Sequence, residues 1–345
     1  MRILFIFSIS WLIFGAQPVF SQTKFTFTEP KMGSPFSITI ATGDSAGAAR
    51  AAFTAFRLAD TLNSILSDYI DSSEINRLSA ASGQERYVPV SPPLFDILRR
   101  AQEAAEMTAG GYDITIGPVV RLWRRARKTG VPPTEADIAS ALGHCGYRHL
   151  HLDSVQRSVW LDIPGMQLDV GGLGKGFVAA AALRQLQQAG FEKAMVNAGG
   201  KIVTGDAPSA QSGWFIGINA PGEKERLLSI LLSLRHNAVA TSGDIYQYLE
   251  WHGKRYSHII DPRTGIGLTR RRNVTAIAAD GATADWLATA CSILSWRRSL
   301  KLLKHFPGAA LLVTEMKRGR VIQKSSVTFK QYLLPDATVD PIYPR

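Results

Sequence analysis

The order of strand-like and helix-like segments is the sequence feature that most constrains the fold. A strand-like stretch at 35–42 precedes two stretches of helical periodicity, at 45–69 and 92–109. Short alternating runs follow, many broken by glycine, before a further helix from near Thr283 and a closing hairpin within 309–325. Strands and helices mix without regular βαβ alternation, which favours an α+β fold with a largely antiparallel sheet and packed helices. We find no linker, so the pattern predicts a single compact domain.

A glycine-rich turn lies between a strand-like run at 166–170 and a long helical run. Gly174, Gly176 and Ala179 match the spacing of a dinucleotide-binding fingerprint, in which backbone amides approach a pyrophosphate at a helix N-terminus. The alternative is that these residues form an ordinary tight turn without binding a ligand. The flanking hairpins lack the repeated βαβ units of a nicotinamide-binding domain, so nicotinamide oxidoreduction is a remote alternative.

The helix from Thr283 carries a carboxylate and a hydroxyl on one face. Asp285 and Thr289 are four residues apart, which aligns their side chains in the first turns. Magnesium prefers a few protein oxygens and completes its shell with water or phosphate. The pair, with one backbone carbonyl, therefore suits a sparse Mg²⁺ site, although Asp285 as a dipole partner and Thr289 as a packing residue remain the alternative.

Two further stretches offer contacts to a planar or polyhydroxy ligand. In GGYDITIGP, Asp113 and Thr115 fall on one face of an expected strand, where an acid and a hydroxyl suit a ribityl or ribose chain. Tyr69, at the end of the first helix, could stack on a planar ligand or simply cap the core.

The stretch SHIIDPRTG, residues 257–265, concentrates reactive groups in a bend. Pro262 fixes its own φ and Gly265 permits the chain to return, so the turn can hold His258, Asp261 and Arg263 around one small volume. A base and a cation could therefore meet there.

The N-terminus predicts an exported protein. Arg2 is followed by roughly a dozen apolar residues and by small residues that suit signal cleavage after Ser21. An uncleaved anchor is the alternative, although a span needs about 18 continuous apolar residues. We expect a signal peptide at 1–21, a mature domain at 22–345, and a location in the periplasm or cell envelope.

The two cysteines and the net charge bear on this expectation. Cys145 and Cys291 could pair in an exported protein, which sequence alone leaves open. The formal net charge of +11 includes basic clusters at 121–128, 270–272 and 296–298. An exported protein meets little nucleic acid, so these clusters indicate a solvated face, peripheral contact with an anionic membrane surface, or an anionic ligand.

Eight segments, in order over nearly the whole mature chain, resemble the FAD:protein FMN transferases, the ApbE family. They are KMGSPFSITI, LSDYIDSSEINRL, GGYDITIGP, LDVGGLGKGF, VNAGG, TSGD, SHIIDPRTG and ADWLATA. The resemblance implies an α+β flavin-binding domain, Mg²⁺, and FAD as donor. It also implies transfer of FMN through a phosphoester to a Thr or Ser of an envelope flavoprotein, with release of AMP.

The resemblance assigns roles to individual residues. Those implied near the flavin ring, the ribityl side and the nucleotide are Met32, Tyr69, Gly111, Tyr112, Asp113, Gly171, Phe177 and Ile260. Those implied on the metal are the Gly174 carbonyl, Asp285 and Thr289, while His258 and Asp261 would face the reacting phosphate.

The chain also departs from the family pattern. Ile114 stands where proline is common, Ala180 where an acid is common, and Gly174 where alanine is frequent. Lys201 follows AGG, where acidic or amide residues are familiar, and it adds positive charge nearby.

Attack of a hydroxyl on a pyrophosphate needs a base, an aligned nucleophile and neutralised phosphate charge. We expect Mg²⁺ to do most of the neutralisation and His258 or Asp261 to accept the proton. Arg263 either pairs with a phosphate or braces Asp261. Hydrolysis of FAD to FMN and AMP, and flavin binding without catalysis, are the competing functions.

Overall fold

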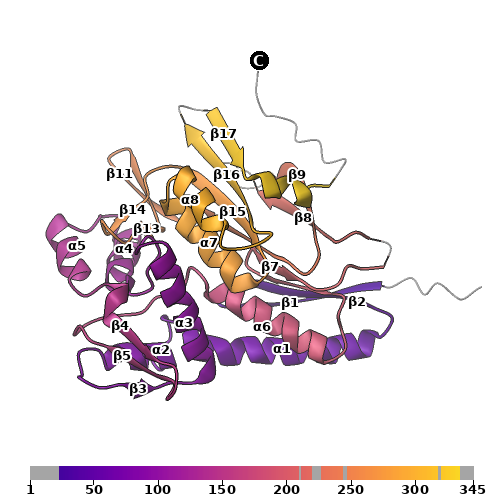
Figure 1. The fold of residues 1–345 in the computed structure, drawn as a ribbon, viewed down its shortest axis with the longest axis horizontal. Helices are drawn as coiled ribbons and strands as arrows, with labels where there is room; N and C mark the ends of the chain where they lie inside the picture. Colours follow the sequence, from indigo (N-terminus) through magenta and orange to yellow (C-terminus); the bar gives the residue numbers. More distant parts are fainter. Residues whose placement is uncertain (1–22, 210, 220–226, 244–246, 318–319, 335–345) are drawn as a thin grey trace, which may run out of the picture.

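An eight-stranded, fully antiparallel sheet crosses the computed structural model (Figure 1). The structure describes residues 23–209, 211–219, 227–243, 247–317 and 320–334, so the expected signal peptide lies outside the described residues. Along the sheet the strands are β1 (Thr23–Lys31), β2 (Ser34–Thr42), β6 (Ala194–Ala198), β7 (Lys201–Thr204), β10 (Ala238–Gly243), β15 (Arg272–Ala278), β16 (Ala310–Lys317) and β17 (Arg320–Ser325).

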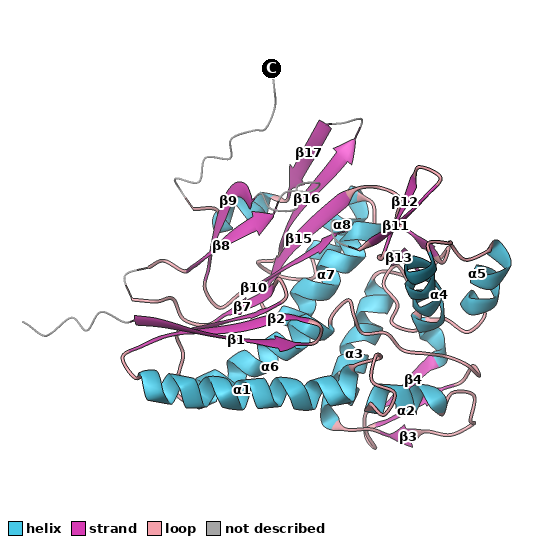
Figure 2. Ribbon diagram, turned by 180° about the vertical axis from the view of Figure 1, so that it is seen from behind, coloured by secondary structure: helices cyan, strands magenta, loops and turns pink. Residues whose placement is uncertain are grey.

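Both faces of the sheet are covered. Helices α1 (Ser45–Leu66), α6 (Gly174–Gln188) and α7 (Gly281–Ile293) pack on one face (Figure 2). The hairpin of β8 (Trp214–Asn219) and β9 (Leu227–Leu234), with the 3₁₀ helix η2 (Val327–Tyr332), covers the other.

Strand β15 shows why this layering follows from the sequence. Successive side chains of a strand point to opposite faces. Val274 and Ala276 accordingly pack with the helices, while Ile277 packs in the cluster beneath the β8–β9 hairpin. A strand covered on both sides needs apolar residues on both sides, which is why 274–278 is apolar except for Thr275.

A second group of elements lies beside the sheet (Figure 1). Its helices are α2 (Glu74–Ala80), α3 (Pro92–Met107), α4 (Gly117–Thr129), α5 (Glu135–Leu142) and the 3₁₀ helix η1 (Tyr147–His149). Its strands are β3 (Val88–Pro89), β4 (Leu150–Asp153), β5 (Ser158–Leu161), β11 (Tyr248–Trp251), β12 (Lys254–Ser257), β13 (Ile260–Asp261) and β14 (Ile266–Gly267).

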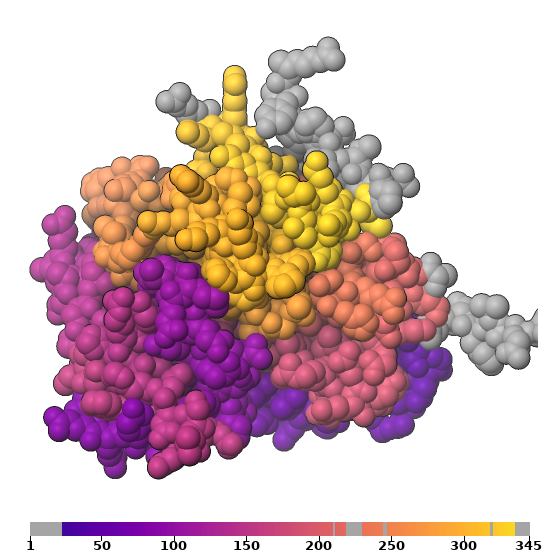
Figure 3. All heavy atoms as spheres, viewed as in Figure 1, coloured from indigo at the N-terminus to yellow at the C-terminus, as the bar shows by residue number. Residues whose placement is uncertain are grey.

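The two groups form one continuous body. In the space-filling view, the purple α3 segment lies against the orange segment of α7 and α8 (Trp296–Leu303) (Figure 3). Arg100 on α3 donates to Asp280, the N-cap residue of α7, over 3.5 Å. The predicted single compact α+β domain is confirmed.

Local signals located most elements correctly. Thr134 caps α5, since its hydroxyl accepts from the Asp137 amide and the Asp137 carboxylate accepts from the Thr134 amide. The helix expected from Thr283 begins at Gly281, and the alternating runs on either side of 154–157 pair as β4 and β5.

Two predicted strands, at Asp113–Thr115 and at 166–170, are wrong. The Asp113 carboxylate accepts from the Thr115 amide at 2.8 Å, a local bond that competes with strand pairing, and Pro118 then sits in the first turn of α4. The two segments are joined by the isolated parallel bridge between Ile116 and Gln167 and by a hydrogen bond from the Asp169 amide to the Ile114 carbonyl over 2.8 Å.

Three expectations about the surface and the thiols can be followed in the structure. Cys145 and Cys291 are both free thiols, so the disulfide between them, which the sequence left open, does not form. Arg272 is buried and donates to the Leu294 carbonyl over 3.1 Å, so it is no part of a basic face. Within the described ranges, no helix combines the length and apolarity that crossing a membrane requires.

Candidate active site

Helices α6 and α7 touch through two glycines. A Cβ added to Gly176 would lie 2.0 Å from the Gly281 carbonyl oxygen, and one added to Gly281 would lie 2.2 Å from the Gly176 carbonyl oxygen. Side chains at either position would force the helices apart. The contact brings the first turns of both helices together, and Asp285 lies one turn into α7.

Asp285 is fully buried and acts as a cap for α6. Its Oδ2 accepts from the Gly176 amide at 3.0 Å, in the helix turn whose partial positive charge favours an anion. Its Oδ1 is buried and has no hydrogen bond, although Lys201 Nζ lies 3.1 Å away in an ion pair outside hydrogen-bond geometry. A buried carboxylate oxygen without a hydrogen bond is an unusual feature that suits a bound cation.

The other metal-site candidates lie around Asp285. Thr289 Oγ1 donates to the Asp285 carbonyl over 3.2 Å and approaches the Gly172 carbonyl at 3.5 Å. Gly174 is the first residue of α6, two positions before the amide that Asp285 binds. Carboxylate, hydroxyl and carbonyl oxygens are ligands that magnesium accepts, so the oxygen types of the three residues suit a hard cation.

Two lysines make this region electropositive. Lys201 Nζ donates to the Thr241 carbonyl over 2.6 Å, and its side chain is mostly buried. Burial lowers the pKa of Lys175, the nearby Lys201 charge lowers it further, and Asp285 opposes both effects. Two close ammonium groups attract an anion such as a phosphate.

The bend at 257–265 is braced by an ion pair. Arg263 Nε and Nη2 donate to the two oxygens of Asp261 over 2.8 and 2.6 Å, in a bidentate fork. Burial raises the pKa of Asp261, but the hydrogen bonds from Arg263 outweigh it and leave the pKa below its ordinary value. Of the two roles expected for Arg263, bracing Asp261 is the one seen here.

The far side of the bend is anchored to the helical group. Trp123 Nε1 on α4 donates to the Gly265 carbonyl over 2.7 Å. A Cβ on Gly265 would lie 2.6 Å from a methyl of Ile138 on α5, and its φ of +67° favours glycine.

His258 is a half-buried, neutral imidazole. Burial lowers its pKa to about 4, and the charges of Arg127, Lys201 and Lys175 act in the same direction. Its Nδ1 lies 3.1 Å from the Gln247 carbonyl. Because a carbonyl only accepts, Nδ1 carries the proton and Nε2 is left as an acceptor.

Tyr112 and Gly111 pack against α7, whereas Asp113 stabilises a turn. The buried Tyr112 ring lies 6.1 Å from that of Trp286, and its hydroxyl has no hydrogen bond among the described residues. A Cβ on Gly111 would come within 3.1 Å of Leu294. Asp113 Oδ1 accepts from Thr115 and Oδ2 from the Tyr147 amide, so both its oxygens are engaged.

An ion-pair cluster supports Tyr69 and Gly171. The exposed Tyr69 ring has the Arg124 guanidinium carbon 4.1 Å from its centroid. Arg124 pairs with Asp68 and, over 2.8 Å, with Asp169, and Asp169 accepts from the exposed Gly171 amide at 2.7 Å. Tyr69 and Gly171 are therefore both held by the ion pair of Arg124 with Asp169.

The remaining candidates lie partly in the core. Met32 and Gly33, with φ of 51° and 69°, form the tight turn between β1 and β2, and Met32 packs partly on the core. Phe177 on α6 and Ile260 on β13 are buried, so most of their side-chain surface already contacts protein.

Comparisons with known proteins cover most of the chain. The model of the ApbE family matches residues 32–313. The chain belongs to the ApbE family. It is 34% identical over 280 residues to a FAD:protein FMN transferase of Treponema pallidum, covering 77% of each chain. It is 32% identical over 262 residues to one from Klebsiella pneumoniae, covering 76% of this chain and 79% of the relative.

Solved ApbE structures share the fold. A flavin transferase ApbE from Vibrio cholerae superposes with a TM-score of 0.80 at 27% identity, covering 90% of this chain and all of that one. An ApbE protein from Thermotoga maritima gives 0.80 at 26% identity, covering 90% and 99%.

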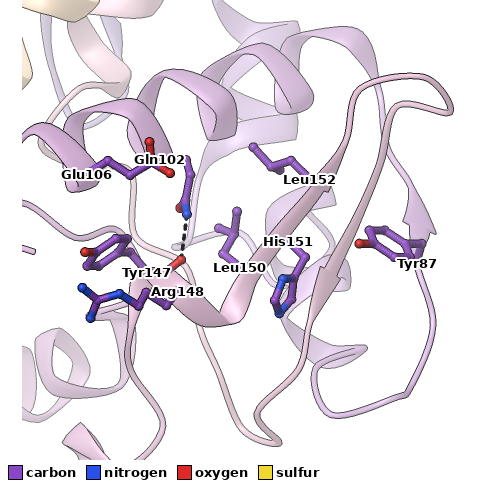
Figure 4. Close-up of a pocket in the computed structure, with 8 residues that line it drawn as sticks. All are labelled: Tyr87, Gln102, Glu106, Tyr147, Arg148, Leu150, His151 and Leu152. Atoms are coloured by element: carbon purple, nitrogen blue, oxygen red, sulfur yellow. Dashed lines mark hydrogen bonds between the residues drawn. The ribbon is translucent and has the colours of Figure 1, made fainter.

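A hollow of about 520 Å³ lies apart from the ApbE motif residues (Figure 4). It is lined by Tyr87, Gln102, Glu106, Tyr147, Arg148, Leu150, His151 and Leu152. Gln102 donates to the Tyr147 carbonyl over 2.9 Å across one wall. Its link to the site is indirect, through the Tyr147 amide that Asp113 binds.

Sequence reasoning missed part of this ApbE site. Arg124 lies in the basic run 121–128, which is typical of a solvated face, so its ion pairs with Asp68 and Asp169 were not predicted. Lys175 stands in the glycine turn, where its position just inside a helix N-terminus could have indicated an anion-binding role.

Proposed function

We propose that this chain transfers FMN from FAD to a Thr or Ser hydroxyl of a target protein and releases AMP. Membership of the ApbE family supports the reaction. The observation that carries the proposal is the buried Asp285 oxygen without a hydrogen bond, near Lys175 at the start of α6 and Lys201 on β7. The site offers a cation-binding oxygen next to positive charge, which suits a pyrophosphate substrate.

The reaction replaces the phosphoanhydride bond of FAD by a phosphoester bond to the acceptor. The acceptor hydroxyl oxygen bonds to the FAD phosphorus on the riboflavin side, the bond from that phosphorus to the bridging oxygen breaks, and AMP leaves with the electron pair. His258 accepts the hydroxyl proton, because Nε2 is unprotonated at neutral pH. Asp261 is the weaker base, since Arg263 engages both its oxygens.

Mg²⁺ is the metal that we propose, held by Asp285, Thr289 and the Gly174 carbonyl. When bound there, the ion would neutralise the negative charge of the FAD pyrophosphate. Lys175 and Lys201 add positive charge on the same side, and the exposed Tyr69 ring offers a surface for the flavin. The chain's own groups thereby orient FAD, while His258 handles the proton.

We further propose that the protein works outside the cytoplasm. The N-terminal segment supports cleavage after Ser21, with the transferase domain at 22–345 and an envelope flavoprotein as acceptor. Exposed Arg121, Arg125 and Lys128 on α4 supply a basic face for peripheral contact with anionic membrane. N-terminal sequencing of protein from the envelope fraction should begin at Gln22, and a sequence beginning at Met1 contradicts cleavage.

One assay tests the reaction. The purified protein is incubated with FAD and Mg²⁺, with or without the envelope fraction of its source cells, while AMP release and in-gel flavin fluorescence are followed. We expect AMP release that depends on the fraction, and a denaturation-resistant fluorescent band. Equal AMP release in both arms without a band supports the pyrophosphatase alternative, and no AMP with retained FAD binding supports a carrier.

A further inference from the structure

Lys201 lies against the oxygen that a metal would use. Its Nζ is 3.1 Å from Asp285 Oδ1, which has no hydrogen bond, and it donates to the Thr241 carbonyl over 2.6 Å. The Lys201 side chain is 14% exposed and that of Asp285 is 1% exposed. A mostly buried ammonium is therefore fixed by one carbonyl at the side of a fully buried carboxylate.

Burial makes such a partner necessary when no metal is bound. An isolated ionised carboxylate in the interior is strongly disfavoured, and the single amide of Gly176 bonds only Oδ2. Lys201 supplies the missing counter-charge at Oδ1. The Lys201 ammonium therefore stands where it can offset the charge of the buried carboxylate when no metal is bound.

A divalent ion and the ammonium compete for this oxygen. Magnesium binds carboxylate oxygens at about 2.0–2.1 Å, so an ion at Oδ1 would lie close to a positive charge in a buried environment. The stem of Lys201 has four rotatable carbons, so Nζ can swing away when Thr241 releases it.

We propose that Lys201 is a built-in competitor of the metal: its ammonium neutralises Asp285 in the apo protein and must withdraw before a divalent cation binds. The proposal rests on the magnesium site proposed above. Metal binding to this chain then exchanges the Lys201 ammonium for a divalent ion at Asp285. Filling the site therefore needs a higher concentration of free metal than filling the same site without the lysine.

Calorimetric titration with Mn²⁺, in the absence of FAD and acceptor, tests this exchange. Lys201→Met removes the charge and keeps the stem, and Lys324→Met removes one exposed charge from β17 of the same sheet as a control. We expect Lys201→Met to bind Mn²⁺ about tenfold tighter or more than the wild type, and Lys324→Met to stay within about twofold of it. Equal or weaker binding by Lys201→Met overturns the proposal.

Asp285→Asn separates this inference from the site itself. We expect it to lose Mn²⁺ binding in the same titration. If it binds like the wild type, both the metal site and the exchange are wrong. If it loses binding while Lys201→Met matches the wild type, only the role of Lys201 is wrong.

Acetylation footprinting of the wild type gives a measurement that needs no variant. Acetic anhydride labelling with mass spectrometry, with and without saturating Mg²⁺, reports how accessible each lysine is. We expect labelling of Lys201 to rise on addition of Mg²⁺ while that of Lys324 stays constant. Unchanged labelling of Lys201 at saturation contradicts the exchange.

Discussion

Asp285 on α7 accepts a hydrogen bond at 3.0 Å from the backbone amide of Gly176 in the first turn of α6. One carboxylate thus caps a neighbouring helix and offers its other oxygen to a cation. The helix cap and the ion pair with Lys201 are therefore combined in a single side chain.

Replacing Asp285 should separate these two roles. Asp285→Ala leaves the Gly176 amide without its acceptor and the Lys201 ammonium without its counter-charge, which we expect to cost about 2–4 kcal/mol of unfolding free energy. Asp285→Asn retains an acceptor for the amide and should cost less, while both variants lose Mg²⁺-dependent AMP release. Urea denaturation of the two variants measures the difference, and equal stabilities would contradict the capping role.

The contact of Gly176 with Gly281 should tolerate no side chain. We expect Gly176→Ala and Gly281→Ala each to lower the unfolding free energy by about 3 kcal/mol or more, because the new Cβ meets backbone. Gly174→Ala is the matched control, since its Cβ would meet only a Val170 methyl at 3.5 Å and its carbonyl is kept. Thermal unfolding checks all three, and a destabilised Gly174→Ala would show that the whole turn is intolerant.

His258 should make stability depend on pH. The pKa of about 4 in the folded state lies below the unfolded value of 6.5, so the unfolded chain binds a proton first as the pH falls. Its contribution is fully present above pH 6.5 and is lost between about pH 6.5 and 4, up to about 3 kcal/mol at 1.36 kcal/mol per pKa unit. His258→Gln should flatten that part of a urea-denaturation series, and a parallel decline in both proteins would refute the assignment.

The fork between Arg263 and Asp261 should matter more for turnover than for stability. The Arg263 side chain is 45% exposed, so Arg263→Ala should cost at most about 1 kcal/mol. We expect AMP release with acceptor to fall tenfold or more, and Arg263→Lys to restore little because lysine cannot form the fork. Arg235→Ala removes a comparable exposed pair with Asp206 and should leave turnover unchanged. Lysine rescue would contradict the geometric role.

Tyr69 should favour transfer over hydrolysis. An aromatic ring over the flavin shields one face of the site, so Tyr69→Asn should raise AMP release without acceptor relative to flavinylation. Tyr69→Phe keeps the ring beside Arg124 and should behave like the wild type. Measuring AMP and covalent flavin in parallel decides this, and an unchanged ratio in Tyr69→Asn would argue against shielding.

Local patterns predicted the elements better than the contacts between them. The pairing of Asp285 with Thr289 follows from helical spacing, and the Thr134 cap from its partner three residues later. The approach of Lys201 to Asp285 does not follow from local spacing, because it depends on how β7 is packed against α7. Similarly, Asp113 was misread because a bond to Thr115 decided its backbone.

The N-terminal hairpin has a consequence for how the chain is made. β2 pairs with β1 on one side and with β6 on the other, where Ile38 lies opposite Val196. As the chain is made from its N-terminus, β1 and β2 can pair at once. The edge of β2 that pairs with β6 has no hydrogen-bonding partner until some 150 further residues have followed. The sheet therefore cannot be completed until the middle third of the chain is available, so the early hairpin waits with one strand edge open.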